Sequence, residues 1–138
     1  MENQEYIGFG RRLVAYIIDI IIVGVSAFLI GVILRLSMSF SSEQAVGEMV
    51  MSVYFVAYLV YFILMESSSK QATVGKMLLK VKVVNGDGER LSLLNAVGRS
   101  FGRLISGMLM GLGYVMILFT KEKQGLHDKL AKTYVVGR

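Results

Sequence analysis

The chain has 138 residues, 54% of them hydrophobic, and a mean hydropathy of +0.60. The apolar residues lie in long blocks, so the sequence predicts an integral membrane protein rather than a water-soluble one, with one domain over residues 1–138. The absence of cysteine excludes disulfides and thiolate metal sites. The net charge of +5 is typical of basic loops on the cytoplasmic side of a membrane, so we expect no nucleic-acid partner.

The first apolar block predicts a membrane-spanning helix. It covers residues 13–34, between Arg12 and Arg35, and contains one ionisable residue, Asp19. About 22 residues form roughly 33 Å of helix, enough to cross a hydrocarbon core of about 30 Å. Arg12 and Asp19 are seven residues apart, so we expect them on nearly one face, with Tyr16 between them. A carboxylate inside a span is a candidate functional site.

The second apolar block, Met49–Met65, has about 17 residues and is near the lower limit for a span. Tyr54, Tyr58 and Tyr61 have the spacing of one helix face. Two interpretations of this stripe, together with Tyr16, remain open. The hydroxyl groups either bond across packed helices or line a polar pathway.

Two short segments predict β structure outside the spans. Residues 79–83 alternate apolar and basic side chains, as a half-buried strand does, and Asn85–Gly88 follows as a turn. Thr133–Val136 is a second β-prone run. If both segments lie on the same side of the membrane, they can pair into a small cytoplasmic β element.

Between these segments, Leu91–Ser106 has the pattern of an amphipathic helix. Its polar stripe consists of residues three or four apart: Ser92, Asn95, Arg99, Arg103 and Ser106. The uncharged run Leu104–Phe119 follows and is interrupted by glycines 107, 111 and 113. The glycines predict a re-entrant or interfacial helical pair, with a third full span as the alternative.

The distribution of charge predicts the orientation in the membrane. The loop after the first span carries one basic residue, whereas the connection after the second carries five: Lys70, Lys76, Lys80, Lys82 and Arg90. This places the N-terminus and the second connection in the cytoplasm. The basic tail, residues 121–138, favours a cytoplasmic C-terminus as well. The expected fold is therefore an all-α, multi-pass protein of the cell membrane, with two transmembrane helices, the helical pair and the small β element.

Several motifs together resemble the RDD family of small membrane proteins. Residues 8–19 read GFGRRLVAYIID, residues 72–84 read ATVGKMLLKVKVV, and residues 124–133 read QGLHDKLAKT. The resemblance covers nearly the whole chain and implies a single RDD-like membrane domain. It assigns the family motif to Arg12, Asp19 and Asp128. It also implies a role in transport, since some members resemble sodium/proton antiporters.

Two functions follow as hypotheses. In the first, the protein is a cation/proton (Na⁺/H⁺) antiporter in which Asp19 alternates between a proton and a cation. Two spans are too few to enclose a pathway, so transport requires a homo-oligomer or a membrane partner protein. In the second, the protein is a non-transporting accessory or regulatory subunit, and Asp19 forms a structural ion pair with Arg99 or Arg103.

An enzyme is the third class that the sequence allows us to consider. It contains no recognisable nucleophile–base pair or metal-binding cluster, and it has one histidine, His127. We therefore expect no catalytic activity, no cofactor and no metal site. His127 is expected to anchor the tail against the last helix.

Overall fold

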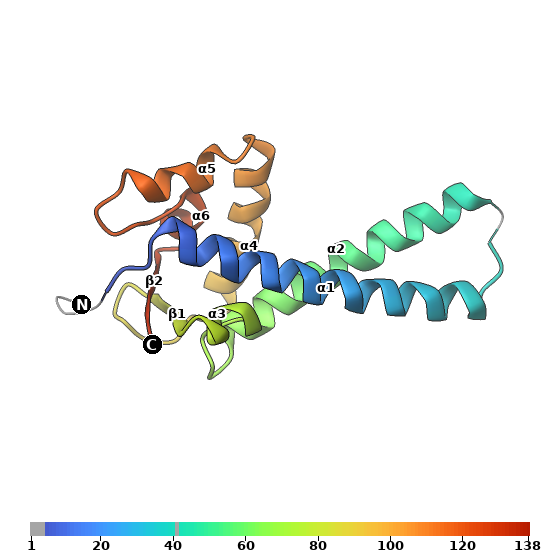
Figure 1. Cartoon of the computed structure of the whole chain (residues 1–138), viewed down its shortest axis with the longest axis horizontal. Coiled ribbons are helices and arrows are strands. Elements are labelled where there is room, and N and C mark those ends of the chain that lie inside the picture. Colours follow the sequence, from blue (N-terminus) through green and yellow to red (C-terminus); the bar gives the residue numbers. More distant parts are fainter. Residues whose placement is uncertain (1–4, 41) are drawn as a thin grey trace.

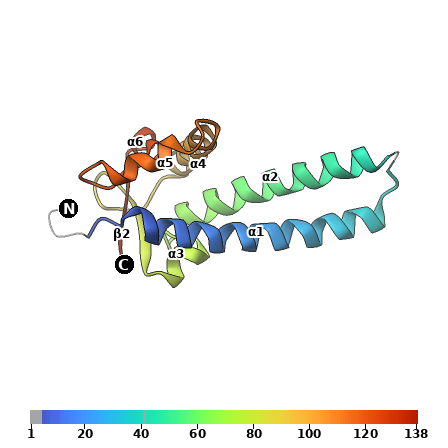
Figure 2. The same cartoon turned by 45° about the horizontal axis from the view of Figure 1, so that its top comes forward.

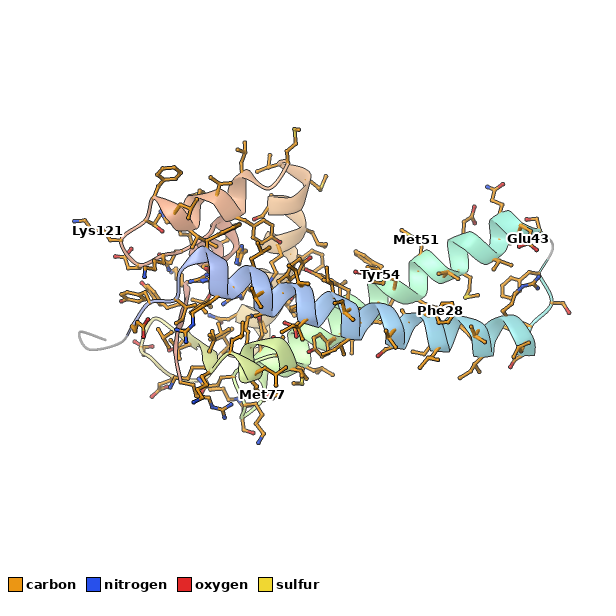
Figure 3. The ribbon with its side chains drawn as sticks, in the orientation of Figure 1. Phe28, Glu43, Met51, Tyr54, Met77 and Lys121 are labelled. Carbon is orange, nitrogen blue, oxygen red and sulfur yellow. The ribbon has the colours of Figure 1, made fainter. Side chains whose placement is uncertain are left out.

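The computed structural model describes residues 5–40 and 42–138. Two long helices, α1 (Phe9–Ser37) and α2 (Glu43–Ser67), form an antiparallel hairpin that is the longest feature of the molecule (Figure 1). The remaining elements gather where α1 begins and α2 ends. We call this part of the molecule the polar end. Lys121 lies there, whereas Phe28 and Met51 project from the hairpin (Figure 3).

Both long helices have the length and composition of membrane spans, which confirms the two predicted spans and extends each by several residues. The apolar side chains of the hairpin are largely exposed, as expected of residues that contact lipid. The part of α1 beyond Asp19, residues 20–37, is about 27 Å long. This part alone nearly matches a hydrocarbon core of about 30 Å.

One face of α1 packs against its neighbours. The buried residues recur mostly every four positions, as helix periodicity requires: Arg12, Ala15, Asp19, Val23, Ala27 and Gly31. Arg12 and Asp19 therefore share a face, as predicted. Val23 packs with Tyr58 and Phe62 of α2 in an apolar cluster.

The polar end contains the small sheet. Strands β1 (Val81–Asn85) and β2 (Thr133–Gly137) pair antiparallel, with Val83 opposite Val135, which confirms both predicted strands and their pairing. Two five-residue helices, α3 (Val74–Leu78) and α6 (Leu126–Leu130), were not predicted. A second apolar cluster lies under the sheet and contains Ile7, Val81, Val83, Leu91, Ala96 and Val135.

The predicted helical pair is present, and a sharp bend separates its two parts. Helix α4 (Leu93–Met108) is followed by α5 (Leu112–Val115) and a 3₁₀ turn, η1 (Met116–Leu118), at an angle of 113°. Gly111 lies at the break with φ +82°, a conformation that glycine adopts without strain. Helix α4 runs across the axis of the hairpin (Figure 1). Helices α5 and α6 lie on one side of α1 and α3 on the other in both views (Figures 1 and 2).

Candidate functional site

Three carboxylates are completely buried where the hairpin joins the polar end. They are Asp19 of α1, Glu66 of α2 and Asp128 of α6, each with 0% exposure. A buried carboxylate is costly unless hydrogen bonds or opposite charges compensate it. The partners of each one therefore explain how the elements are held together.

Asp19 is compensated by neutral donors. Its Oδ1 accepts hydrogen bonds from the Tyr61 hydroxyl and the Gly75 backbone N–H, both at 2.8 Å, and its Oδ2 accepts one from the Thr73 hydroxyl at 2.6 Å. The Tyr61 hydroxyl also accepts from the Val74 N–H at 3.0 Å. This carboxylate therefore ties α2 and the first turn of α3 to α1.

The predicted ion pair between Asp19 and Arg99 or Arg103 is wrong. Among the described residues, both arginines form their ion pairs with Glu66 or Asp128, and no ion pair involves Asp19. The physical reason is the short helix α3, whose first turn brings hydroxyl and N–H donors to Asp19 and satisfies both carboxylate oxygens.

Glu66 ends the second span and gathers three cations. Lys76 of α3 and Arg103 of α4 both donate to its carboxylate, and the Nε of Arg99 lies 3.3 Å from its Oε2. The Arg103 guanidinium also lies 4.4 Å from the centre of the Phe62 ring. Burial lowers the pKa of Lys76 to about 8, although the charge of Glu66 opposes this shift.

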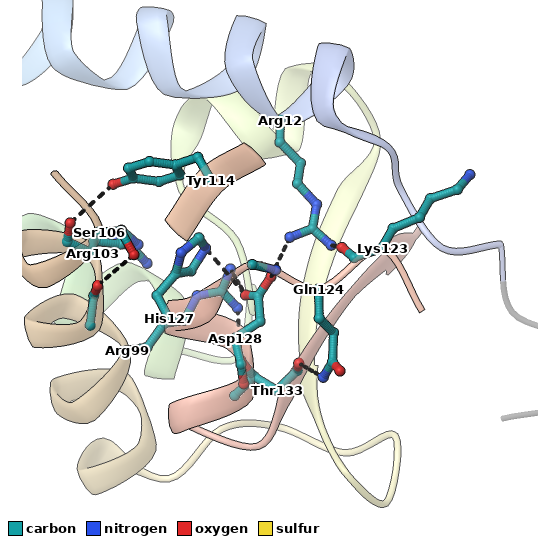
Figure 4. Close-up of polar contacts among 12 residues, drawn as sticks. Arg12, Arg99, Arg103, Ser106, Tyr114, Lys123, Gln124, His127, Asp128 and Thr133 are labelled. Atoms are coloured by element: carbon teal, nitrogen blue, oxygen red, sulfur yellow. Dashed lines mark hydrogen bonds and ion pairs between the residues drawn. The ribbon is translucent and has the colours of Figure 1, made fainter. Parts of the chain in front are cut away.

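Asp128 forms the second ion-pair cluster (Figure 4). It accepts hydrogen bonds from Arg12 of α1 and from the Gly125 N–H at 3.1 Å, and its Oδ1 forms an ion pair with Nη2 of Arg99 at 2.7 Å. Burial alone would raise the pKa of Asp128, but the charges of Arg99 and Arg12 outweigh it and hold the pKa below its usual value. Arg12 and Asp128, to which the resemblance assigns two positions of the family motif, are thus direct partners.

Arg99 connects the two clusters because its guanidinium contacts both Glu66 and Asp128. Arg12 adds backbone contacts, donating from Nε to the Ile7 carbonyl at 2.8 Å and from Nη2 to the Lys123 carbonyl at 2.6 Å. The network therefore joins the N-terminal segment, both spans, α4 and the C-terminal tail.

His127 is a buried neutral side chain beside Asp128. Burial lowers its pKa to about 3, and the nearby arginines lower it further, although Asp128 opposes them. Its ring packs against Tyr114 with centres 5.2 Å apart, and its Nε2 lies 3.4 Å from Asp128. This position matches the predicted role as an anchor of the tail.

A cavity of about 340 Å³ lies beside the network. Its wall includes the carboxylate of Asp19 and the cations Arg12, Lys76, Arg99 and Arg103. A second cavity of about 290 Å³ continues from it and is lined by Tyr16, Tyr54 and Tyr58. Both cavities share Tyr16, Arg103 and Tyr114. Three of the four tyrosines predicted to line a pathway therefore line this second cavity, while Tyr61 bonds to Asp19.

Sequence reasoning missed part of the site. Glu66 was not predicted as a site residue, although an isolated carboxylate directly after about 17 apolar residues is a usable signal. Lys76 was counted as a loop cation, and the hydroxyl of Thr73 gave no signal at all. Their partners lie ten or more residues away along the chain, so the sequence pattern does not identify them.

The fold and the site together define a small integral membrane protein with two spans and an internally ion-paired polar end. The chain belongs to the RDD family, which it matches over residues 6–132. It is similar to the uncharacterized protein YxaI of Bacillus subtilis, with 36% identity over 145 aligned positions covering 94% of this chain and 95% of that protein.

A second relative is the uncharacterized membrane protein YteJ of the same organism, with 30% identity covering 97% of this chain and 82% of YteJ. The uncharacterized protein YckC, also from Bacillus subtilis, is 30% identical, covering 93% of this chain and 82% of YckC. No solved structure matches the chain.

Proposed function

We propose that this protein is a non-transporting accessory or regulatory subunit of the cell membrane, with its polar end in the cytoplasm. The observation that carries the proposal is that Asp19 accepts three hydrogen bonds from neutral donors on two other elements. Tyr61, Thr73 and Gly75 direct hydrogens at the carboxylate, so its oxygens serve to join helices. A carboxylate held in this way is a poor ligand for a cation.

The outer part of the hairpin also supports a non-transporting role. The hydroxyl of Ser26 donates to the Ile22 carbonyl, and that of Ser52 donates to the Glu48 carbonyl, each at 2.8 Å and within its own helix. Because these hydroxyl groups bond within their own helices, they do not line a polar pathway between α1 and α2 in the part of the hairpin beyond Tyr54. One copy of the hairpin provides lipid contacts rather than an ion path.

The cytoplasmic orientation rests on charge. The described polar end carries most of the basic residues, and basic segments favour the cytoplasmic side of a membrane. A partner in the same membrane has two surfaces available: the exposed apolar faces of the hairpin and the basic surface of the polar end.

Antiport is the second candidate, favoured by one observation: Asp19 contributes to the wall of the 340 Å³ cavity, which continues into the tyrosine-lined one. An oligomer that extended these cavities through the hairpin would provide a pathway with an ionisable group at one end. In that case Asp19 would exchange a proton for a cation and exchange its hydrogen-bond partners during each cycle.

Ion flux distinguishes the two candidates. The purified protein is reconstituted into liposomes with an internal pH dye and pulsed with sodium or potassium. We expect no cation-dependent proton movement from the folded protein. In a separate experiment, cross-linking in cells should join the polar end to a second membrane protein in a stoichiometric amount. Proton movement that disappears in Asp19→Asn but persists in Tyr61→Phe would overturn the accessory role in favour of antiport.

A further inference from the structure

The 340 Å³ cavity has the chemistry of a ligand site. We propose that it binds the anionic phosphate headgroup of a membrane phospholipid, with the acyl chains lying along the exposed apolar face beside it. This inference is independent of the accessory role, since a transporter could carry the same lipid site. Its volume lies in the range of about 300–1,000 Å³ that is usual for ligand pockets.

The charge of the wall favours an anion. Four cationic side chains line the cavity. Three buried carboxylates lie near them: Asp19, Glu66 and Asp128. One positive charge is therefore in excess, in a region largely removed from water. Because Asp19 takes its hydrogen bonds from neutral groups, it neutralises no particular cation by direct contact.

Two of the lining arginines have unused hydrogen-bonding capacity. The Nη1 of Arg103 is buried and donates no hydrogen bond, and the Nε of Arg99 donates none either, although it lies 3.3 Å from Oε2 of Glu66 in an ion pair. Both side chains are almost completely buried and contribute to the cavity wall. Buried donors without acceptors are unfavourable, and guanidinium groups match phosphate oxygens in geometry and charge.

The mouth of the cavity favours a lipid over a soluble anion. Three of the lining residues are exposed and apolar: Leu13 at 42%, Met110 at 94% and Val115 at 40%. They belong to the same exposed apolar surface that α1 and the α4–α5 pair present outward. A ligand that enters between these side chains needs an apolar part as well as an anionic group.

The depth of the cavity also suits a headgroup. Residues 20–37 of α1 account for the hydrocarbon core, so Arg12 and the cations beside it lie at the level where headgroups begin. Basic pockets between helices at this level are known to bind anionic lipid headgroups.

The test uses purified full-length protein in a neutral detergent. Melting temperature and native mass spectrometry report the binding of four probes: dihexanoyl phosphatidylglycerol, dihexanoyl phosphatidylcholine, glycerol 1-phosphate and inorganic phosphate. We expect only the phosphatidylglycerol to raise the melting temperature and to remain bound. Equal binding of phosphatidylcholine would overturn the proposal. An equal shift with inorganic phosphate would assign the site to a free anion and overturn the lipid assignment.

Matched variants locate the binding. Val115→Glu places a negative charge at the mouth, whereas Leu118→Glu places the same charge on the same exposed surface outside the cavity. We expect Val115→Glu to weaken phosphatidylglycerol binding by about fivefold or more, and Leu118→Glu to leave it unchanged. Equal affinity in the two variants would contradict the assigned site. Met110→Glu, at a still more exposed position of the mouth, provides the same comparison if Val115→Glu does not fold.

Discussion

Asp19 shows how a carboxylate can be buried without a positive charge in contact. Two hydroxyl groups and a backbone N–H donate three hydrogen bonds to its two oxygens, and α2 and the start of α3 hold these donors in place. Glu66 and Asp128 follow the other solution, in which several cations surround one carboxylate. Removing the charge therefore has different consequences at the three sites, although all three are fully buried.

The largest effect is expected at Glu66. Glu66→Gln leaves Lys76, Arg99 and Arg103 buried together without their shared counterion, which should destabilise the protein by about 3–5 kcal/mol. Glu43→Gln is the matched control, because Glu43 is 88% exposed and its contact with Arg35 is at the surface. Thermal unfolding in detergent measures both. Equal melting temperatures for the two variants would contradict the role of Glu66 at the centre of a cluster.

Acidification should destabilise the protein through His127. Its folded-state pKa of about 3 lies below the ordinary value of 6.5, so the unfolded chain binds the proton first. The contribution of the neutral His127 to the free energy of unfolding is fully present above about pH 6.5 and is lost as the pH falls toward 3. Asp128, whose pKa is also lowered, contributes a further loss only below its ordinary value of 3.8.

The measurement is the melting temperature between pH 7.5 and 4.5 for wild type and His127→Gln. The free energy of unfolding of the wild type should fall by up to about 1.4 kcal/mol per pH unit for this one proton, which lowers its melting temperature, and the variant should lose most of this pH dependence. The same pH dependence in both proteins would show that the pKa of His127 is not lowered by folding, and would contradict its burial as a neutral side chain.

At the scale of elements, the close approach of α3 to α1 decides how the polar end attaches to the hairpin. A Cβ at Gly75 would overlap the carbonyl oxygen of Ala15 and lie 3.0 Å from Oδ1 of Asp19. Glycine is therefore required by contact between two helices rather than by its backbone angles. The same contact brings the Gly75 N–H within 2.8 Å of the Asp19 carboxylate.

Gly75→Ala should therefore separate α3 from α1 and destabilise the protein by about 1–3 kcal/mol. Gly98→Ala is the control, since nothing lies within 4 Å of its added methyl group and alanine favours a helix by roughly 1 kcal/mol. Melting temperatures should fall for the first variant and stay equal or rise for the second. A lower melting temperature for Gly98→Ala than for Gly75→Ala would contradict this packing.

The sequence predicted the elements whose side chains repeat with a clear period. Both spans, the amphipathic α4, the glycine break and the pairing of the two strands were recognisable in this way. Helices α3 and α6 have five residues each, too few for a periodic pattern. The partner of Asp19 was wrong for a related reason: its donors reside on α3 and on Tyr61, and no spacing identifies a neutral donor 42 or more residues away.

The molecule as a whole is a membrane hairpin whose buried ion pairs, among the described residues, all lie at one end. The N-terminal segment and β2 are joined directly, since the Ile7 N–H donates to the Val135 carbonyl at 2.9 Å. The chain end at Arg138 therefore lies on the same side as the β1 turn, while the loop between α1 and α2 lies at the opposite end (Figure 1).

Cysteine accessibility tests this arrangement most directly, because the chain has no native cysteine. Single variants Ser39→Cys, Gly86→Cys and Arg138→Cys are exposed to an impermeant thiol reagent in sealed cells and again after lysis. The account predicts that the reagent reaches position 39 from outside and positions 86 and 138 only after lysis. Labelling of position 138 from outside, with position 86 still protected, would mean that the α4–α5 pair crosses the membrane, and would contradict the account.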